Sequence, residues 1–161
     1  KLIDKKYDIE LDLVGPAYPL ALNDLNKTIC QNKLNDKVNY LGELNKDLII
    51  EKYKNSDIFV FASSCETFGM IVLESMAAGL PIACSNRSAM PEILNDNAEY
   101  FDPDDPNEIS SAIESIIINK SKSKKLSFES QKRARIFSWE KCSKETFEFI
   151  SSLMIERVKI L

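Results

Sequence analysis

Residues Asp57 to Pro81 read DIFVFASSCETFGMIVLESMAAGLP, and this stretch decides the fold. Its opening residues, 57–62, are almost wholly apolar, as in a strand that is covered on both faces of a parallel sheet. A polar loop over 63–67 leads into apolar positions at helical spacing over 68–78, and Gly79-Leu80-Pro81 ends that helix. We therefore predict a buried strand, a polar loop and a helix in direct succession.

The loop and the start of this helix carry two carboxylates. In open α/β sheets, ligands lie at this strand-to-helix edge, where unpaired amides at a helix N-terminus attract an anion. Gly69 allows a ligand to approach the backbone, Glu74 follows about a turn and a half into the helix, and Glu66 precedes it. Two carboxylates beside an amide cradle suit a ligand with hydroxyls at both ends and a phosphate between them, which is a sugar nucleotide.

Strand and helix patterns alternate along the rest of the chain. Asp105 is a predicted N-cap for a helix that starts at Pro106, and Glu108 completes a capping box with it. The alternation predicts an α/β fold with a doubly wound parallel sheet. The expected strands cover 9–15, 38–41, 57–62, 81–84 and 98–101, and the expected helices cover 19–34, 46–54, 68–78, 91–94, a segment from 106, 122–135 and 139–158.

Composition agrees with one ordinary domain. The chain has 161 residues, of which 44% are hydrophobic and 29% charged. A net charge of −4 gives no reason to expect nucleic acid or an anionic membrane as the main partner. No apolar run reaches the ~20 residues of a membrane span, and the charged start KLIDKKYDIE is no signal peptide. Four cysteines without C-x-x-C spacing indicate reduced thiols. The sequence has no histidine and no Asp-x-Asp cluster at a strand end, so we expect no metal site, and we expect no cofactor.

Residues 66–81 closely resemble the Glu-x7-Glu segment of the family-4 retaining glycosyltransferases, which have two Rossmann-like domains in the GT-B fold. The resemblance covers nearly the whole chain, and it implies that this chain is one Rossmann-like half of a GT-B enzyme. It continues through Leu13–Gly15, Val38–Gly42, Met90–Leu94, Phe101–Asp105 and Phe137–Glu140.

The resemblance also implies roles for individual residues. Glu74 would accept hydrogen bonds from the ribose 2′- and 3′-hydroxyls, and Glu66, the catalytic residue, would hold hydroxyls of the transferred sugar. The amides of Phe68, Gly69 and Met70, next to Thr67 in the same donor-binding loop, would receive the diphosphate charge. Gly42-Glu43-Leu44 resembles the stretch whose backbone receives the nucleotide base, with a plain turn as the open alternative.

In the resembled family this domain opens with a further strand and helix that carry a basic pair. Lys1, Lys5 and Lys6 do not match that pair, so we expect 1–161 to be a single C-terminal nucleotide-sugar-binding domain whose first strand and helix, and whose N-terminal acceptor domain, are absent. Alone it should be inactive. The apolar side of the last helix should be exposed or self-associate through 147–160, with Phe147, Ile150, Leu153 and Met154 on that side.

The implied function is transfer of a hexosyl or N-acetylhexosaminyl group from a nucleoside diphosphate sugar, which we expect to be a UDP-sugar. The acceptor would be a glycan or lipid-linked molecule of bacterial surface polysaccharide synthesis, in the cytoplasm or peripherally at the inner face of the cell membrane. The alternatives are a sugar-nucleotide epimerase half-domain, which should show histidine, and a non-catalytic flavodoxin-like binding module. Nearby, we expect Arg87 to be solvated, Glu92 to brace its loop, Cys65 not to be a nucleophile, and Trp139 to anchor the last helix in the core.

Overall fold

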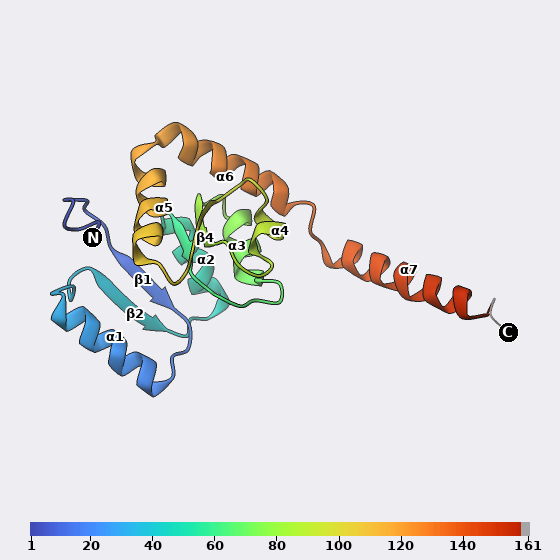
Figure 1. Ribbon diagram of the computed structural model, residues 1–161, viewed down its shortest axis with the longest axis horizontal. Helices are drawn as coiled ribbons and strands as arrows, with labels where there is room; N and C mark the ends of the chain where they lie inside the picture. The colour runs from blue at the N-terminus through green and yellow to red at the C-terminus, as the bar shows by residue number, and fades with distance from the viewer. Residues whose placement is uncertain (159–161) are drawn as a thin grey trace.

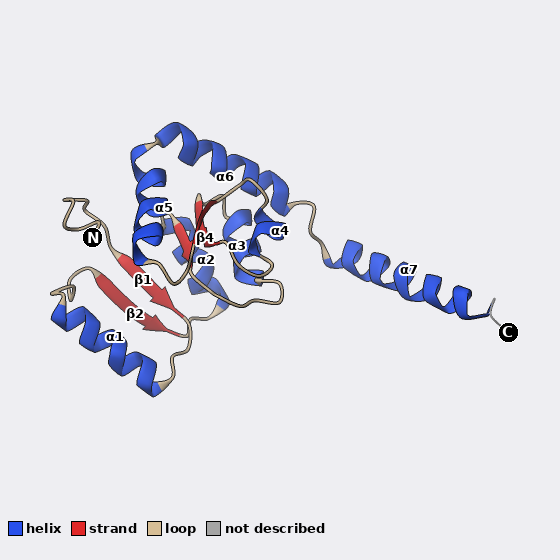
Figure 2. Cartoon of the chain, in the orientation of Figure 1, coloured by secondary structure: helices blue, strands red, loops and turns tan. Residues whose placement is uncertain are grey.

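The computed structural model describes residues 1–158, with side chains described through Leu153. Helices and strands alternate in the predicted order, and their boundaries lie within a few residues of the predicted ones (Figures 1 and 2). The strands are β1 (Leu11–Val14), β2 (Val38–Gly42), β3 (Phe59–Phe61), β4 (Ile82–Ser85) and β5 (Glu99–Phe101). The helices are α1 (Pro19–Gln31), α2 (Lys46–Asn55), α3 (Met70–Ala77), α4 (Met90–Leu94), α5 (Pro106–Ile118), α6 (Lys120–Ala134) and α7 (Trp139–Val158).

All strand pairs are parallel, but the strands form two sheets. β1 pairs with β2, with Leu11 opposite Val38, and the register shifts between Leu13 and Val14. β3, β4 and β5 form the second sheet in that order, with Phe59 opposite Ile82 and Ala83 opposite Glu99. We predicted one continuous sheet. Within the described residues, no ladder joins β1 to β3, so each of these strands keeps one unpaired edge.

Helices cover both faces of the second sheet, which confirms the doubly wound α/β fold. On one face, residues of α3 and α4 pack with β4 around Val72, Met76 and Met90. On the other face, Phe101 packs with residues of α5 and α6, including Ile116 and Leu126. β4 lies between the two layers, and each of its four residues is buried.

The strand of the deciding stretch is less buried than its apolar sequence predicts. Phe59, Val60 and Phe61 are all only partly buried, whereas β4 is buried throughout. The physical reason is position: in the part of the chain that the structure describes, β3 is an edge strand, with β4 on one side and no paired strand on the other. An apolar strand at an open edge keeps part of its surface in contact with water.

Capping residues set the starts of two helices. Asn45 caps α2 by accepting a hydrogen bond from the Leu48 amide at 3.0 Å, and Asp105 caps α5 as predicted, accepting from the Asn107 amide at 2.7 Å. The predicted capping box is wrong, because the Glu108 carboxylate accepts from the amide of Asp102 at 2.7 Å and not from that of the cap residue. Glu108 therefore fastens the loop between β5 and α5.

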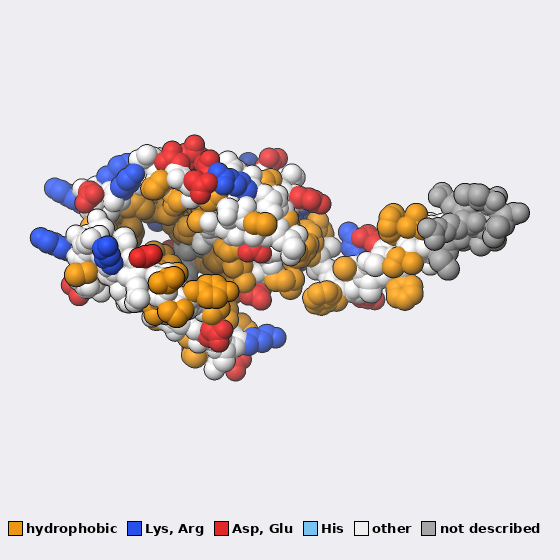
Figure 3. All heavy atoms as spheres, turned by 60° about the horizontal axis from the view of Figure 1, so that its bottom comes forward, with side chains coloured by type: hydrophobic (Ala, Val, Ile, Leu, Met, Phe, Trp, Pro, Cys, Tyr) orange, Lys and Arg blue, Asp and Glu red, His pale blue; other side chains and the backbone are white. Residues whose placement is uncertain are grey.

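Helix α7 projects away from the body of the molecule (Figure 1). The prediction that Trp139 anchors it in the core is wrong, since this side chain is 78% exposed. The apolar residues Phe147, Ile150 and Leu153 are exposed as expected, and hydrophobic side chains stand out along the helix in Figure 3. The side chain of Met154 and the end of the 147–160 segment lie outside the described residues.

No helix in the described part is long and apolar enough to cross a membrane.

Candidate functional site

The predicted ligand loop lies between the end of β3 and the start of α3, and Gly69 is the last residue before the helix. Gly69 has φ of 77° and ψ of 58°, a left-handed conformation that favours glycine. A Cβ atom at Gly69 would lie 2.7 Å from the Cε atom of Met90, which is fully buried. The backbone thus favours glycine at this position, and any larger residue would also have to displace the terminal methyl group of the buried Met90.

Free backbone donors gather at this turn. Within the described residues, the amides of Phe68, Gly69 and Met70 have no protein acceptor. They lie at the N-terminus of α3, where the helix dipole adds partial positive charge. Thr67 precedes them and is exposed, as is the Phe68 side chain, whose ring packs edge-on against Phe137 at 6.0 Å between centroids. This arrangement can receive an anion from the solvent side.

Glu66 is held by a residue that the sequence did not single out. The Ser88 hydroxyl accepts a hydrogen bond from the Glu66 amide at 3.0 Å and donates one to the Glu66 carbonyl oxygen at 2.5 Å. Ser88 itself has φ of 59°, an uncommon conformation for a residue other than glycine. Both backbone polar groups of Glu66 are therefore occupied, and its partly buried side chain is left available for a ligand.

Glu74 lies on the exposed side of α3 and also has an unforeseen partner. The hydroxyl of Tyr53, on α2, lies 3.1 Å from Oε2 of Glu74 and 3.3 Å from the carbonyl oxygen of Ile71. Burial and the neighbouring Glu74 carboxylate raise the pKa of Tyr53 well above its usual value. No sequence motif marks Tyr53, because it lies 21 positions from Glu74 in the chain.

The stretch predicted to receive a base lies where β2 passes into α2. Gly42 ends β2 with φ of 65°, and its carbonyl oxygen accepts a hydrogen bond from the Gly15 amide at 2.9 Å. Leu44 is partly buried and immediately precedes Asn45, the N-cap of α2. The contact between α2 and α3 at Tyr53 is what connects this stretch to the Glu74 end of the site.

Other residues near the loop correct or extend the sequence interpretation. The Arg87 side chain is 38% exposed, in line with the expectation of a solvated charge, and it also forms ion pairs with Asp102 and Asp104, each at 2.7 Å. Glu92 lies within α4, and the expected bracing of a loop by this residue is not seen in the described part of the chain: its carbonyl oxygen accepts a hydrogen bond from Arg133 of α6 at 2.8 Å, which joins the two helices. Cys65 is an exposed free thiol. Among the described residues, no group of three potential ligands is placed to hold a metal ion.

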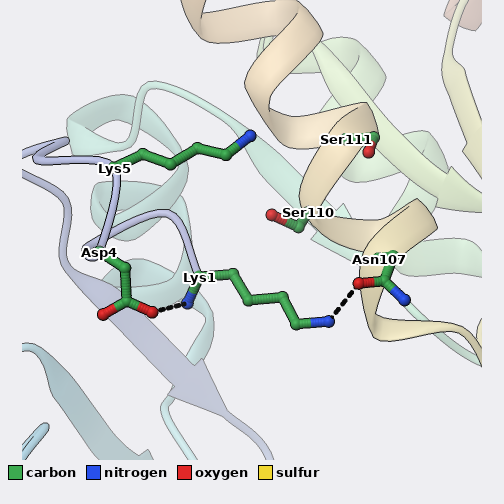
Figure 4. Close-up of a pocket in the computed structure, with 6 residues that line it drawn as sticks. All are labelled: Lys1, Asp4, Lys5, Asn107, Ser110 and Ser111. Atoms are coloured by element: carbon green, nitrogen blue, oxygen red, sulfur yellow. Dashed lines mark hydrogen bonds and ion pairs between the residues drawn. The ribbon is translucent and has the colours of Figure 1, made fainter.

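A separate hollow lies between the N-terminal turn and α5 (Figure 4). Lys1 crosses it, with its Nζ atom 2.5 Å from Oδ1 of Asn107 and its terminal amine 3.4 Å from Asp4. Lys5 and two serines complete the lining, and none of the residues predicted for ligand binding takes part. We therefore place the candidate site at the loop before α3 and not in this hollow.

Comparison with known proteins agrees with this fold. The chain is 32% identical over 109 residues to O-antigen chain mannosyltransferase B of Escherichia coli, covering 68% of this chain but 29% of that protein. The structure matches Anabaena Alr3699/HepE in complex with UDP and glucose, with TM-score 0.80, 22% identity, and coverage of 89% of this chain and 40% of that one. It also matches the C-terminal domain of a glycosyl transferase group 1 family protein (LpcC) from Francisella tularensis, with TM-score 0.73, 25% identity, and coverage of 82% and 71%.

The chain spans less than a third of the length of the O-antigen relative and about two fifths of the HepE chain. Its fold, with helices on both faces of parallel strands, is the one found in GT-B glycosyltransferases. The sequence model that describes glycosyl transferases group 1 matches residues 1–133, which is most of the chain. The chain therefore belongs to the glycosyl transferases group 1 family.

Proposed function

We propose that this chain is the C-terminal donor-binding domain of a family-4 retaining glycosyltransferase, and that its ligand is a nucleoside diphosphate sugar. The observation that carries the proposal is the arrangement around α3: the amides of Phe68, Gly69 and Met70, which have no acceptor in the described structure, lie between Glu66 on the loop and Glu74 on the helix. Positive partial charge flanked by two carboxylates matches a diphosphate with hydroxylated groups at both ends.

The role that we propose for each residue follows from its chemistry. Negative charge grows on the leaving diphosphate as the bond to the sugar breaks. The backbone amides already point toward the diphosphate, so they stabilise this charge without a change in protein conformation. Glu74 accepts hydrogen bonds from the ribose, and Glu66 orients the transferred sugar. Gly42 and Leu44 supply backbone contacts to the base. We propose no metal and no organic cofactor, because the amides occupy the place where charge has to be neutralised.

The donor and acceptor are proposed from the relatives. Anabaena HepE has been crystallised with UDP, with UDP and glucose, and with UDP-glucose, which supports a UDP-hexose over an N-acetylhexosamine donor. The O-antigen mannosyltransferases support a glycan or lipid-linked acceptor of surface polysaccharide synthesis. We accordingly propose action in the cytoplasm, peripherally at the inner membrane face. No observation favours the epimerase, and membership of the group 1 family leaves the flavodoxin-like module without support.

We further propose that the complete enzyme adds an acceptor domain and one more strand. The support is physical: among residues 1–158, β1 and β3 each have an unpaired edge, and Leu11 and Val14 on β1 are 44% and 43% exposed. Figure 3 shows a hollow bordered by hydrophobic side chains on this face of the body. In the common doubly wound order, the first strand lies between the second and the fourth, which here would be between β1 and β3. The isolated chain should then be inactive.

Replacing Glu66 by glutamine in the full-length enzyme tests the proposed function. Glu66→Gln should lower turnover with the preferred donor about tenfold or more, because only the charge on the sugar-facing acceptor changes. Affinity for the bare nucleoside diphosphate should stay within about twofold of the wild-type value. Glu114→Gln, a carboxylate on α5 outside the site, is the matched control. A loss of nucleotide affinity as large as the loss of turnover would contradict the assignment of Glu66 to the transferred sugar, because it would mean that Glu66 contacts the nucleotide.

A further inference from the structure

We propose that Tyr53 is a positioning residue that orients the Glu74 carboxylate toward the ribose, an inference that rests on the proposed function. Its hydroxyl lies 3.1 Å from Oε2 of Glu74, so the two side chains join α2 to α3. Tyr53 does not reach the ligand in this assignment. It acts through Glu74 by fixing which carboxylate lone pairs face the ribose.

Tyr53 is itself held firmly enough to do this. Its ring packs at a tilt against that of Phe59 on β3, with 5.9 Å between centroids, and its hydroxyl also lies 3.3 Å from the carbonyl oxygen of Ile71. The side chain is partly buried, whereas Glu74 is exposed. A flexible glutamate at the surface is thus held by a rigid aromatic residue, which reduces the rotamer entropy that Glu74 would lose on binding.

The hydrogen bond has one direction at neutral pH. The raised pKa of Tyr53 keeps its hydroxyl protonated, and of the two acceptors that can take its one hydrogen, Oε2 of Glu74 at 3.1 Å is closer than the Ile71 carbonyl oxygen at 3.3 Å, so Tyr53 donates and Glu74 accepts. A carboxylate offers about four lone-pair sites, of which Tyr53 uses one. The Oε1 atom keeps both of its sites within the described residues, so two ribose hydroxyls can still be accepted while Tyr53 remains in place.

Helix α2 carries Tyr53 and also begins next to the residues proposed to contact the base. Tyr53 lies on α2, whose N-cap directly follows Leu44 in the stretch proposed to receive the base. A shift of α2 would therefore move the base contacts and the Tyr53 hydroxyl together. The same helix thus fixes the spacing between the base and ribose contacts of the nucleoside.

The test is a double-mutant cycle in the full-length enzyme, measured by calorimetric titration with UDP and, in parallel, with GDP. Whichever of the two nucleotides binds, Tyr53→Phe should weaken its binding about three- to tenfold, and Glu74→Ala should weaken it about tenfold or more. Added to Glu74→Ala, Tyr53→Phe should cause less than about a twofold further loss, because the carboxylate that accepts from Tyr53 is gone. Tyr7→Phe is the control, since Tyr7 donates to Glu114 at the same 3.1 Å outside the site.

A ligand without ribose hydroxyls separates positioning from a merely structural role. The wild-type enzyme and Tyr53→Phe should bind the 2′,3′-dideoxy form of the same nucleotide equally well, because Glu74 then has nothing to accept. If Tyr53→Phe weakens binding of the ribose and dideoxy forms alike, or adds its full effect to Glu74→Ala, the positioning role is wrong. If Glu74→Ala itself changes nothing, the ribose assignment in the proposed function fails instead.

Discussion

Gly69 shows how much of the site is decided by single residues. Its place in the sequence motif predicts close approach of a ligand to the backbone, and the structure adds that Met90 occupies the space beneath it. Glu66, Gly69 and Glu74 could be proposed as site residues from the sequence because they lie within nine consecutive positions of one strand-loop-helix unit. Tyr53 and Ser88 could not, since their partners are 21 and 22 positions away and only the folded chain brings them together.

Substituting alanine for Gly69 should destabilise the fold more than the same change at Gly79. Both glycines have φ of 77°, so a left-handed alanine costs about 1–2 kcal/mol at either position. At Gly69 the new Cβ also meets the buried Met90 methyl at 2.7 Å, whereas at Gly79 it meets the Gln131 amide nitrogen at 3.1 Å. Overpacking should add about 1 kcal/mol to the loss in Gly69→Ala. Equal free energies of unfolding for the two variants in urea titrations would contradict this packing argument.

At the scale of elements, alternation and capping signals predicted the order, type and approximate bounds of the helices and strands. Three features of the structure could not be predicted from the sequence. The split between β1 and β3 depends on a strand pairing that no local pattern reports. Glu108 binds Asp102 because the turn after β5 brings that amide within reach. Trp139 is exposed because α7 leaves the body before any partner covers it, as Figure 1 shows.

The cap of α5 predicts a pH dependence of stability. Hydrogen bonds from the Asn107 amide lower the pKa of Asp105 below its usual value of 3.8, because they favour the charged form. A carboxyl group with a lowered folded-state pKa stabilises the fold above its unfolded-state pKa, and this contribution is lost as the pH falls through the folded-state value. Asp105→Asn keeps an N-cap but should flatten the decline in unfolding midpoint below about pH 4.

The control for this pH profile is Asp57→Asn, which alters an exposed carboxylate without a hydrogen-bond partner in the described part of the chain. Urea midpoints would be measured between about pH 2.5 and 7, around the unfolded-state pKa. Asp57→Asn should follow the wild-type profile. An Asp105→Asn profile as steep as that of the wild type would show that the cap does not set the acid response.

At the scale of the whole molecule, several apolar surfaces lie uncovered within the described residues. The core is concentrated around the β3–β5 sheet, while β1 and the apolar side of α7 remain exposed. A pattern within one chain can predict which of its surfaces are apolar, but it cannot specify what covers them. For this reason the proposed functional experiments use the full-length protein, in which an acceptor domain and a strand beside β1 are expected.

The central claim is that a nucleoside diphosphate binds to the amides before α3, between Glu66 and Glu74. Amide hydrogen exchange of the full-length enzyme, resolved to single residues and measured with and without the UDP-sugar or GDP-sugar it uses, tests this most directly. We predict that the donor slows exchange at Phe68, Gly69 and Met70, which have no acceptor within the described residues. Unchanged exchange at these amides, with protection confined to the hollow between Lys1 and Ser111, would contradict the account.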